Sequence, residues 1–377
     1  MTTLRLLADD LTGALDSAAE FVRLCGPVEA RWTDGVGEQL PPSLAVDSAT
    51  RELPAAEAAA RVARLAPMLR GADIAYKKRG ADVAYKKIDS LLRGAWAAEL
   101  AACLDLGEWR HCIFAPAFPH QARLTKGGRQ LAYLDGRWRP VGADPVAELR
   151  RLGLAVQAAQ VNRTPADGVS VFDAETEADL DRVVATGSLA PEPVLWCGSG
   201  GLARALARSR PVETSSRLQP PILGLFGSDH PVTAAQLAAC GGLWLAVDGR
   251  EASLRRVERQ LSTSGAAMVG VTLPSGMTRT AAAARIGQIL ALVAETVGRP
   301  GTLIVAGGET LRGVCGALGA EALVVTGQVA PGLPRSRVRG GRWDGLPIVS
   351  KSGAFGPPGL WRDLLAANGL MPGEDEA

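Results

Sequence analysis

Short apolar runs alternate with alanine-rich stretches along nearly the whole chain. The apolar runs have the length and composition of strands that are buried on both faces of a parallel sheet. The stretches between them carry apolar residues at helical spacing. In the first half, strands are expected at residues 4–8, 28–32, 44–47, 169–172 and 194–197. This alternation predicts an α/β fold built on largely parallel sheets.

The second half repeats the same alternation. Strands are expected at residues 222–226, 243–247, 267–273, 302–306, 323–328 and 347–350, with a turn at 330–334. A polar, proline-bearing stretch at 210–221 separates the halves, and 377 residues are enough for two domains of ordinary size. We therefore expect domains at 1–212 and 220–377. Each should be a three-layer, Rossmann-like arrangement of a sheet flanked by helices.

A nearly perfect tandem repeat interrupts the pattern, because residues 70–78 recur as 79–87. Nine residues are too few for a solenoid repeat. Only one copy can occupy the strand's place in the sheet. The second copy continues directly into Ile88 and the motif after it, so we assign the strand to that copy. The first copy is then a loop or a helix extension, and nothing in the sequence explains why it is there.

Composition excludes several classes of protein. A net charge of +2, from 41 basic and 39 acidic residues, argues against a nucleic-acid or membrane-surface protein. No apolar run reaches the roughly 18 residues of a membrane span. The six cysteines are far apart and form no CxxC pair, and there are three histidines, which argues against a zinc site or a disulfide framework. We expect a cytoplasmic protein.

Two aspartates, Asp9 and Asp10, follow the first predicted strand, and a helix follows them. Ligands in open α/β sheets bind outside the carboxyl ends of the strands, so this turn is a natural site. The two carboxylates can hold a metal, orient a substrate hydroxyl or take its proton. Alternatively, one of them caps the helix.

Charged side chains also follow two later strands. Arg51 comes shortly after the strand at 44–47, as a clamp for a carboxylate or as an ordinary surface arginine. Lys87, Asp89 and Ser90 follow the strand of the second repeat copy. A helix is expected next, with Arg93 in its first turn, where its charge opposes the helix dipole. This position favours a ligand-binding role for Arg93.

Two further turns of the first half remain ambiguous. The loop at 120–128 carries Arg123, a lysine and two glycines, which suit an anion or a basic surface hairpin. The glycine-rich turn at 198–201 can cradle a phosphate or allow a helix and a strand to pack closely.

Three turns of the second half suit a nucleotide. They are Gly227-Ser228, residues 307–310 and residues 351–353, and each follows a predicted strand. Paired glycines before a helix leave backbone N–H groups where a phosphate can bind. Glu309 can hold a metal or accept the ribose hydroxyls. Neither a P-loop nor a GxGxxG motif is present.

Taken together, these stretches resemble the four-carbon acid sugar kinase family. The matching segments are residues 8–14, 87–94, 116–119 with Arg123, Gly227-Ser228 with Thr233 and Gln236, 307–310, and 351–356. They occur in the family's order and span nearly the whole chain.

The resemblance implies a sugar-acid-binding first domain, an ATP-binding second domain and an active site in the cleft between the domains. It implies transfer of the γ-phosphoryl group to a terminal hydroxyl of erythronate, threonate or a 3-oxo form, with Mg²⁺ bridging the phosphates. By motif, the residues facing the sugar acid would be Asp9, Arg51, Lys87, Asp89 and Ser90. Those facing ATP would be Ser228, Gly307, Gly308, Glu309, Thr310 and Gly353.

Our hypothesis from these residues is that Arg51 and Lys87 bind the substrate carboxylate, while Asp9 or Asp10 orients or deprotonates the attacking hydroxyl. A homodimer is compatible with this arrangement. The chain departs from the family's usual residues at Leu91, Ala95 and Ala354, where threonine and two asparagines are common. These departures motivate one alternative, a non-catalytic sugar-acid or nucleotide sensor. The missing GxGxxG motif counts against another, a dinucleotide oxidoreductase.

Overall fold

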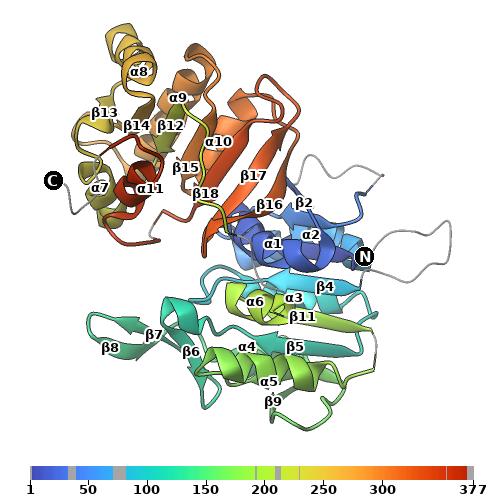
Figure 1. Cartoon of the computed structure of the whole chain (residues 1–377). Helices are drawn as coiled ribbons and strands as arrows, with labels where there is room; N and C mark the ends of the chain where they lie inside the picture. Colours follow the sequence, from blue (N-terminus) through green and yellow to red (C-terminus); the bar gives the residue numbers. More distant parts are fainter. Residues whose placement is uncertain are drawn as a thin grey trace. The chain divides into compact units, whose positions relative to one another are not determined.

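The computed structural model describes residues 2–32, 40–70, 82–191, 193–208, 214–228, 230–353 and 355–371. By its contacts the chain divides into two compact units, unit 1 at Met1–Val212 and unit 2 at Glu213–Ala377. Unit 1 takes the blue-to-green part of the colour bar and unit 2 the yellow-to-red part (Figure 1). Each unit is an α/β structure, which confirms the expected fold class.

Unit 1 is built on a sheet in which every pair of neighbouring strands is parallel. The strands, in their order across the sheet, are β2 (Val28–Trp32), β3 (Leu44–Asp47), β1 (Leu4–Ala8), β4 (Val83–Lys87), β11 (Val194–Gly198), β5 (His111–Ala115), β10 (Gly168–Phe172) and β9 (Val156–Ala159). Because they are parallel, their carboxyl ends meet at one edge. The strand β4 comes from the second repeat copy, as expected. Most of the first copy lies outside the described residues.

The helices of unit 1 form two groups. Helices α1 (Leu11–Cys25), α6 (Gly200–Ala207) and α5 (Glu177–Gly187) pack side by side, and α2 (Ala55–Leu65) packs on α3 (Trp96–Leu104), followed by α4 (Pro145–Arg151). Successive side chains of β4 point to opposite faces of the sheet, and each face is covered by one of the two groups of helices. Ala84 lies in the core with α2 and α3, whereas the ring of Tyr85 contacts Phe21 of α1. The sheet is therefore covered on both faces, as a fully buried parallel sheet requires.

A small antiparallel sheet is attached to unit 1. It consists of β6 (Arg123–Lys126), β7 (Arg129–Leu134) and β8 (Arg137–Pro140), after the short helix η3 (Pro119–Gln121). Figure 1 shows β7 and β8 extending away from the main sheet of unit 1. The side chain of Gln130, which is buried, donates to the carbonyls of Ser90 at 2.8 Å and Pro116 at 3.3 Å. The strands β6 and β7 form the hairpin that one interpretation of the 120–128 loop predicted.

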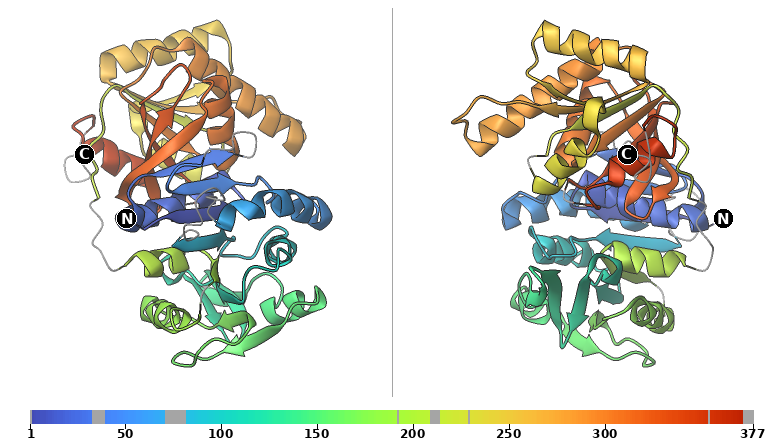
Figure 2. Two further views of the ribbon diagram at one scale, coloured as in Figure 1. Left: turned by 90° about the vertical axis from the view of Figure 1, so that its right-hand side faces the viewer. Right: turned by 60° about the vertical axis from the view of Figure 1, so that its left-hand side comes forward.

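Unit 2 has a mixed sheet, and Figure 2 gives two further views of its alternating strands and helices. The strand order is β13 (Trp244–Val247), β14 (Ala266–Val271), β12 (Ile222–Phe226), β15 (Thr302–Ala306), β18 (Pro347–Lys351), β17 (Leu333–Arg339) and β16 (Ala322–Ala330). Only β16, β17 and β18 pair antiparallel within this order. The helices are α7 (Pro231–Ala238), α8 (Glu251–Ser264), α9 (Arg279–Thr296), α10 (Gly308–Ala317) and α11 (Leu360–Ala366).

Three local features differ from what the sequence predicted. The predicted turn at 330–334 is shorter, because β17 already begins at Leu333 and returns alongside β16. The strand β9, at one edge of its sheet, was missed. The helix expected around Arg93 begins only at Trp96, so Arg93 lies in the preceding turn. A polar, arginine-rich edge segment such as 333–339 lacks the apolar run on which strand prediction depends.

All six cysteines are free and buried, four of them in unit 1 and two in unit 2. Burial raises the pKa of each thiol, for Cys103, Cys240 and Cys315 to about 12. Among the described residues, none of the helices combines the length and the hydrophobicity that a membrane span needs.

A fully buried ion pair lies in the core of unit 1. Nζ of Lys86 lies 2.7 Å from Oε2 of Glu99 on α3, and both side chains are fully buried. Nζ also donates to the carbonyl of Lys87 at 3.1 Å, whereas Oε1 of Glu99 has no partner among the described residues. Burial alone would lower the pKa of Lys86, but the Glu99 carboxylate outweighs it and raises that pKa.

We expect Lys86→Met to lower the free energy of unfolding by about 3–5 kcal/mol, because it leaves the Glu99 charge buried and unpaired. The double variant Lys86→Met, Glu99→Met should recover most of this loss, since two apolar side chains replace the pair. Urea unfolding followed by circular dichroism measures both. A double variant as unstable as the single one would show that the loss comes from packing rather than from charge.

Candidate functional site

The carboxyl ends of three neighbouring strands bring the predicted residues of unit 1 together. Strand β1 lies between β3 and β4 in the sheet. Asp9 follows β1, Arg51 follows β3, and Lys87 ends β4. The register places Ala8 beside both Asp47 and Lys87, so the turns after the three strands start at the same level.

Arg51 is the centre of this cluster and is only 13% exposed. Its guanidinium donates in a fork to both carboxylate oxygens of Asp9, with Nη2 at 2.8 Å from Oδ1 and with Nε on Oδ2. It also lies 3.2 Å from Asp10 and 3.3 Å from Asp89. Burial alone would lower the pKa of Arg51, but the three carboxylates raise it. The guanidinium is therefore permanently charged and held in place.

Asp9 is almost fully buried and is committed to Arg51. Both of its carboxylate oxygens accept from that guanidinium, and its backbone carbonyl accepts from the amides of Thr50 and Arg51 at 3.0 and 3.2 Å. Burial by itself would raise the pKa of Asp9. The hydrogen bonds and charge of Arg51, with Lys87 and Lys86, outweigh burial and hold that pKa below its ordinary value.

Asp10 is the N-cap of α1, as the capping alternative predicted. Its Oδ1 accepts from the amide of Gly13 at 2.9 Å, and its Oδ2 accepts from the hydroxyl of Thr12 at 2.8 Å. Its side chain is 29% exposed, so it remains accessible to a ligand in a way that Asp9 is not.

Lys87 places a nearly buried ammonium beside the start of α1. Alternation along β4 sends it to the face opposite Lys86. Its Nζ donates to the carbonyl of Ile88 at 2.9 Å, and a Cβ placed on Gly13 would lie 3.0 Å from this nitrogen. Within the described ranges the ammonium has no other hydrogen-bond partner and no ion pair within 4 Å. Two of its three donors are therefore free for a ligand.

Asp89 organises the turn that contains Ser90 and Arg93. Its oxygens accept from the Arg93 guanidinium at 2.8 and 2.8 Å and from the amides of Leu91 and Arg93 at 3.1 and 3.2 Å. Burial would raise the pKa of Asp89, but Arg93 and Arg51 hold it well below its usual range. The position of Arg93 has a local reason, which is its pair with Asp89, and its side chain is 62% exposed.

Arg123 lies at the start of β6 and is electrostatically coupled to Asp89 and Arg93. Its Nη1 donates to Oε1 of Gln121, whereas its buried Nε has no partner among the described residues. Burial lowers the pKa of its guanidinium. The structure thus brings Arg123 to the same group of charges.

Sequence reasoning missed Asp16 of α1, which lies six residues after the N-cap Asp10. Gly13 is three residues from each of them and neighbours both on the helix surface, and this spacing was the available signal. A Cβ on Gly200 would lie 3.0 Å from Oδ2 of Asp16. Burial and the charge of Glu20 raise the pKa of Asp16 to about 6, although Lys87 and Arg204 pull it down.

The glycine-rich turn at 198–201 allows close packing. A Cβ on Gly198 would lie 2.4 Å from the carbonyl of Ala115, and one on Gly201 would lie 2.4 Å from that of Ala117. Ser199 caps α6 by accepting from the amide of Gly201 at 3.1 Å, and its hydroxyl donates to Ala117. The close-packing alternative accounts for these glycines without a phosphate.

In unit 2, the predicted nucleotide-facing residues gather at the carboxyl ends of β12, β15 and β18, which are neighbours. A Cβ on Gly227 would lie 2.0 Å from the hydroxyl of Thr310, and one on Gly353 would lie 2.8 Å from that of Ser228. A side chain at either position would have to displace the hydroxyl beside it, so these two glycines allow the three turns to touch.

Helix α10 offers backbone donors at this edge. It begins at Gly308, and no side chain caps it. The preceding Gly307 has φ = 101°, a conformation that favours glycine. The first amides of a helix have no partner within it, so those of Gly308, Glu309 and Thr310 suit a phosphate group. The Glu309 side chain is exposed, and among the described residues its carboxylate has no partner.

Two side chains hold the turn that carries Gly353 in place, one from the turn itself and one from α7. The buried Nζ of Lys351 donates to the carbonyls of Ser352, Gly353 and Phe355 at 2.9, 2.8 and 2.9 Å. The hydroxyl of Thr233 donates to the carbonyl of Gly353 at 2.9 Å. Lys351 therefore orders the turn and has no donor left for a ligand. The Ala354 departure lies outside the described residues.

A metal has few protein ligands here. Over the described parts of the chain, no group of three or more His, Cys, Asp or Glu side chains is arranged to hold an ion. Glu309 is a single carboxylate beside the α10 amides. This arrangement fits an ion that takes most of its ligands from phosphates and water.

Comparison with known proteins accounts for nearly the whole chain. A model described as the sugar-binding N-terminal domain matches residues 4–154 and 138–206, and one described as the nucleotide-binding C-terminal domain matches residues 223–360. The D-threonate kinase of Bordetella bronchiseptica is 31% identical over 93% of this chain and 94% of its own. The D-threonate kinase of Cupriavidus necator is 33% identical over 94% and 96%. The D-erythronate kinase of Heliobacterium modesticaldum is 26% identical over 94% of each chain.

Solved structures agree on the fold. A crystal structure from Salmonella typhimurium LT2 superposes with a TM-score of 0.75 at 20% identity, over 96% of this chain and 98% of its own. One of a Haemophilus influenzae protein gives 0.69 at 19% identity, over 96% and 99%.

The raised pKa of Asp16 makes a prediction about stability and pH. The folded state holds this proton more tightly than the unfolded chain, so Asp16 costs stability as the pH rises from about 4 to about 6. Relative to the wild type, Asp16→Asn should therefore gain roughly 1–3 kcal/mol of unfolding free energy between pH 4.0 and 7.5. Urea unfolding at the two pH values measures this gain. The control is Asp105→Asn, at the exposed end of α3. An Asp16→Asn difference that changes no more with pH than that of the control would contradict the raised pKa of Asp16.

Proposed function

The chain belongs to the four-carbon acid sugar kinase family, and we propose that it transfers the γ-phosphoryl group of ATP to the terminal hydroxyl of a four-carbon sugar acid. We further propose D-threonate as the substrate to test first, because two relatives named D-threonate kinase are 31% and 33% identical to this chain. Erythronate and 3-oxo-tetronate are the neighbouring choices.

The observation that carries the proposal is the free ammonium of Lys87. It is 6% exposed, two of its donors have no partner among the described residues, and it lies at the edge where the three strands end. A nearly buried cation with free donors is a binding site for an anion, and the carboxylate of a sugar acid is such an anion. Arg51 adds positive charge to this site. Because most of its donors already contact carboxylates, we assign to it mainly the positioning of Asp9, Asp10 and Asp89.

Of the two aspartates, Asp10 is the better partner for the attacking hydroxyl. Both oxygens of Asp9 are occupied by Arg51, and its side chain is 1% exposed. Asp10 is 29% exposed, and its carboxylate and the ammonium of Lys87 both lie close to Gly13. In phosphoryl transfer a carboxylate mainly orients the hydroxyl and accepts its proton as the bond to phosphorus forms.

The edge of unit 2 fits the phosphates of a nucleotide. The amides at the start of α10, the hydroxyl of Ser228 and the backbone of Gly353 would hold the phosphate oxygens, with Glu309 near the ribose or a phosphate-bound Mg²⁺. Bound Mg²⁺ supplies charge neutralisation at the β- and γ-phosphates. Catalysis in this chemistry consists mostly of positioning and electrostatic stabilisation, which suits a site that is rich in fixed charges.

A substrate panel tests the activity. We expect ATP consumption in the presence of Mg²⁺ with D-threonate, at a rate above that with erythronate, 3-oxo-tetronate or five-carbon acids, and none without an acid. NMR of the product should place the phosphate on the terminal carbon. Binding of ATP and of an acid without turnover on any of them would favour the sensor alternative instead.

The role of Lys87 makes a sharper prediction. Lys87→Met should raise the KM for the sugar acid by roughly 10–100-fold, because one charge-assisted contact contributes about 1.5–3 kcal/mol, while the KM for ATP stays unchanged. The matched control is Lys126→Met in the same unit, whose ammonium pairs with Glu175 at 3.0 Å and is 64% exposed. Equal kinetics for the two variants would remove Lys87 from the acid site.

A further inference from the structure

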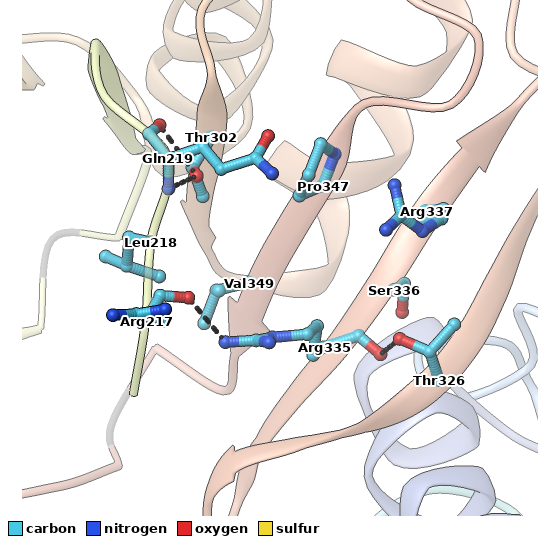
Figure 3. A pocket seen from close by; sticks show the side chains of 10 residues that line it. All are labelled: Arg217, Leu218, Gln219, Thr302, Thr326, Arg335, Ser336, Arg337, Pro347 and Val349. Carbon is cyan, nitrogen blue, oxygen red and sulfur yellow. Dashed lines mark hydrogen bonds between the residues drawn. The ribbon is translucent and has the colours of Figure 1, made fainter. Parts of the chain in front are cut away.

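A pocket of unit 2 lies apart from the proposed nucleotide site. It contains about 420 Å³ of space, part of it open to solvent, and is lined by Arg217, Gln219, Thr302, Arg335, Arg337 and neighbouring residues (Figure 3). Thr302 and Pro347 are the first residues of β15 and β18. The proposed nucleotide residues follow the last residues of the same two strands, roughly 13 Å further along at about 3.3 Å per residue.

Three arginines give this pocket its charge. Among the described residues that line it, none is acidic. Arg335 donates to the carbonyls of Ser215 and Arg217, the latter at 2.7 Å, and Arg337 donates to the carbonyl of Gly345 at 3.2 Å. Figure 3 shows Arg335 extending to the segment that carries Arg217. In the part of the chain that the structure describes, none of the three has a carboxylate oxygen within 4 Å.

The strand β17 holds two of these charges close together. Arg335 and Arg337 are two residues apart, so their side chains leave the strand on the same face. Burial and the charge of Arg337 lower the pKa of Arg335. The antiparallel pairing with β18 places Val349 beside Arg335 and Pro347 beside Arg337, which gives the pocket an apolar floor.

We propose that this pocket binds the phosphate group of a small molecule. Guanidinium groups match phosphate oxygens in paired hydrogen bonds, and the pocket is open to solvent, so that an anion can enter it. A phosphate monoester carries nearly two negative charges at neutral pH, against one for a carboxylate, and therefore better fits three arginines that have no carboxylate partner among the described residues. The amide side chain of Gln219 supplies a polar group at the rim of the pocket.

Isothermal titration calorimetry on the full chain tests the site with three probes at constant ionic strength. They are glycerol 3-phosphate, inorganic phosphate and acetate, each added to protein saturated with a non-hydrolysable ATP analogue. We expect one site for the phosphate probes and weaker binding of acetate. A preference for glycerol 3-phosphate would identify an organic ester as the ligand, and a preference for inorganic phosphate would identify the free ion. Acetate binding as tightly as both would overturn the phosphate assignment.

Variants place the binding in this pocket. Arg337→Gln should weaken both phosphate probes by roughly ten-fold or more, because it removes a charged donor. Arg256→Gln, on an exposed position of α8, makes the same change of charge elsewhere in unit 2 and should leave the affinity unchanged. The ATP analogue should bind all three proteins equally, so this result does not depend on the kinase activity. Equal phosphate affinity in the two variants would exclude the pocket as the site.

Discussion

The edge of the first sheet depends on one mostly buried guanidinium. Arg51 is shared by Asp9, Asp10 and Asp89, which follow two different strands, while Arg51 itself follows a third. Without it, Asp9 would be a buried charge with no direct partner, which costs several kcal/mol. One cation thus fixes the ends of three strands, and the ammonium of Lys87 lies at the same edge, where its charge also acts on Asp9 and Asp89.

Much of this arrangement follows from the sequence. Strand ends in a parallel sheet meet at one edge, so polar residues directly after apolar runs, such as Asp9 and Lys87, are expected to gather. The same reasoning predicted that Ser228, Thr310 and Gly353 gather at one edge in unit 2. The turns touch there because Gly227 packs against Thr310 and Gly353 packs against Ser228. The second repeat copy was rightly chosen as the strand, because it continues into the residues that must stand at the edge.

Other features depend on contacts between distant segments, which spacing along the chain does not encode. The two adjacent lysines of β4 look alike in the sequence. They point to opposite faces of the sheet, and only the contact with Glu99 on a later helix shows that Lys86 belongs to a core ion pair, whereas Lys87 is the proposed ligand-binding group. Arg93 forms a fork with Asp89, a local partner that its place after the strand did not reveal, and its role toward a ligand stays a prediction. The strand β17 was missed because it is rich in arginine. Lys351 orders its own turn through three carbonyls.

The reactivity of the buried thiols reports how often the structure around each of them opens. A thiol with a raised pKa and no access to solvent reacts with alkylating reagents only when the structure around it opens. Four of the cysteines belong to unit 1 and two to unit 2. Pulsed alkylation read out by mass spectrometry therefore reports the local opening of each unit separately in the native chain, without an introduced label. The same burial protects these sulfur atoms from oxidants while the fold is closed.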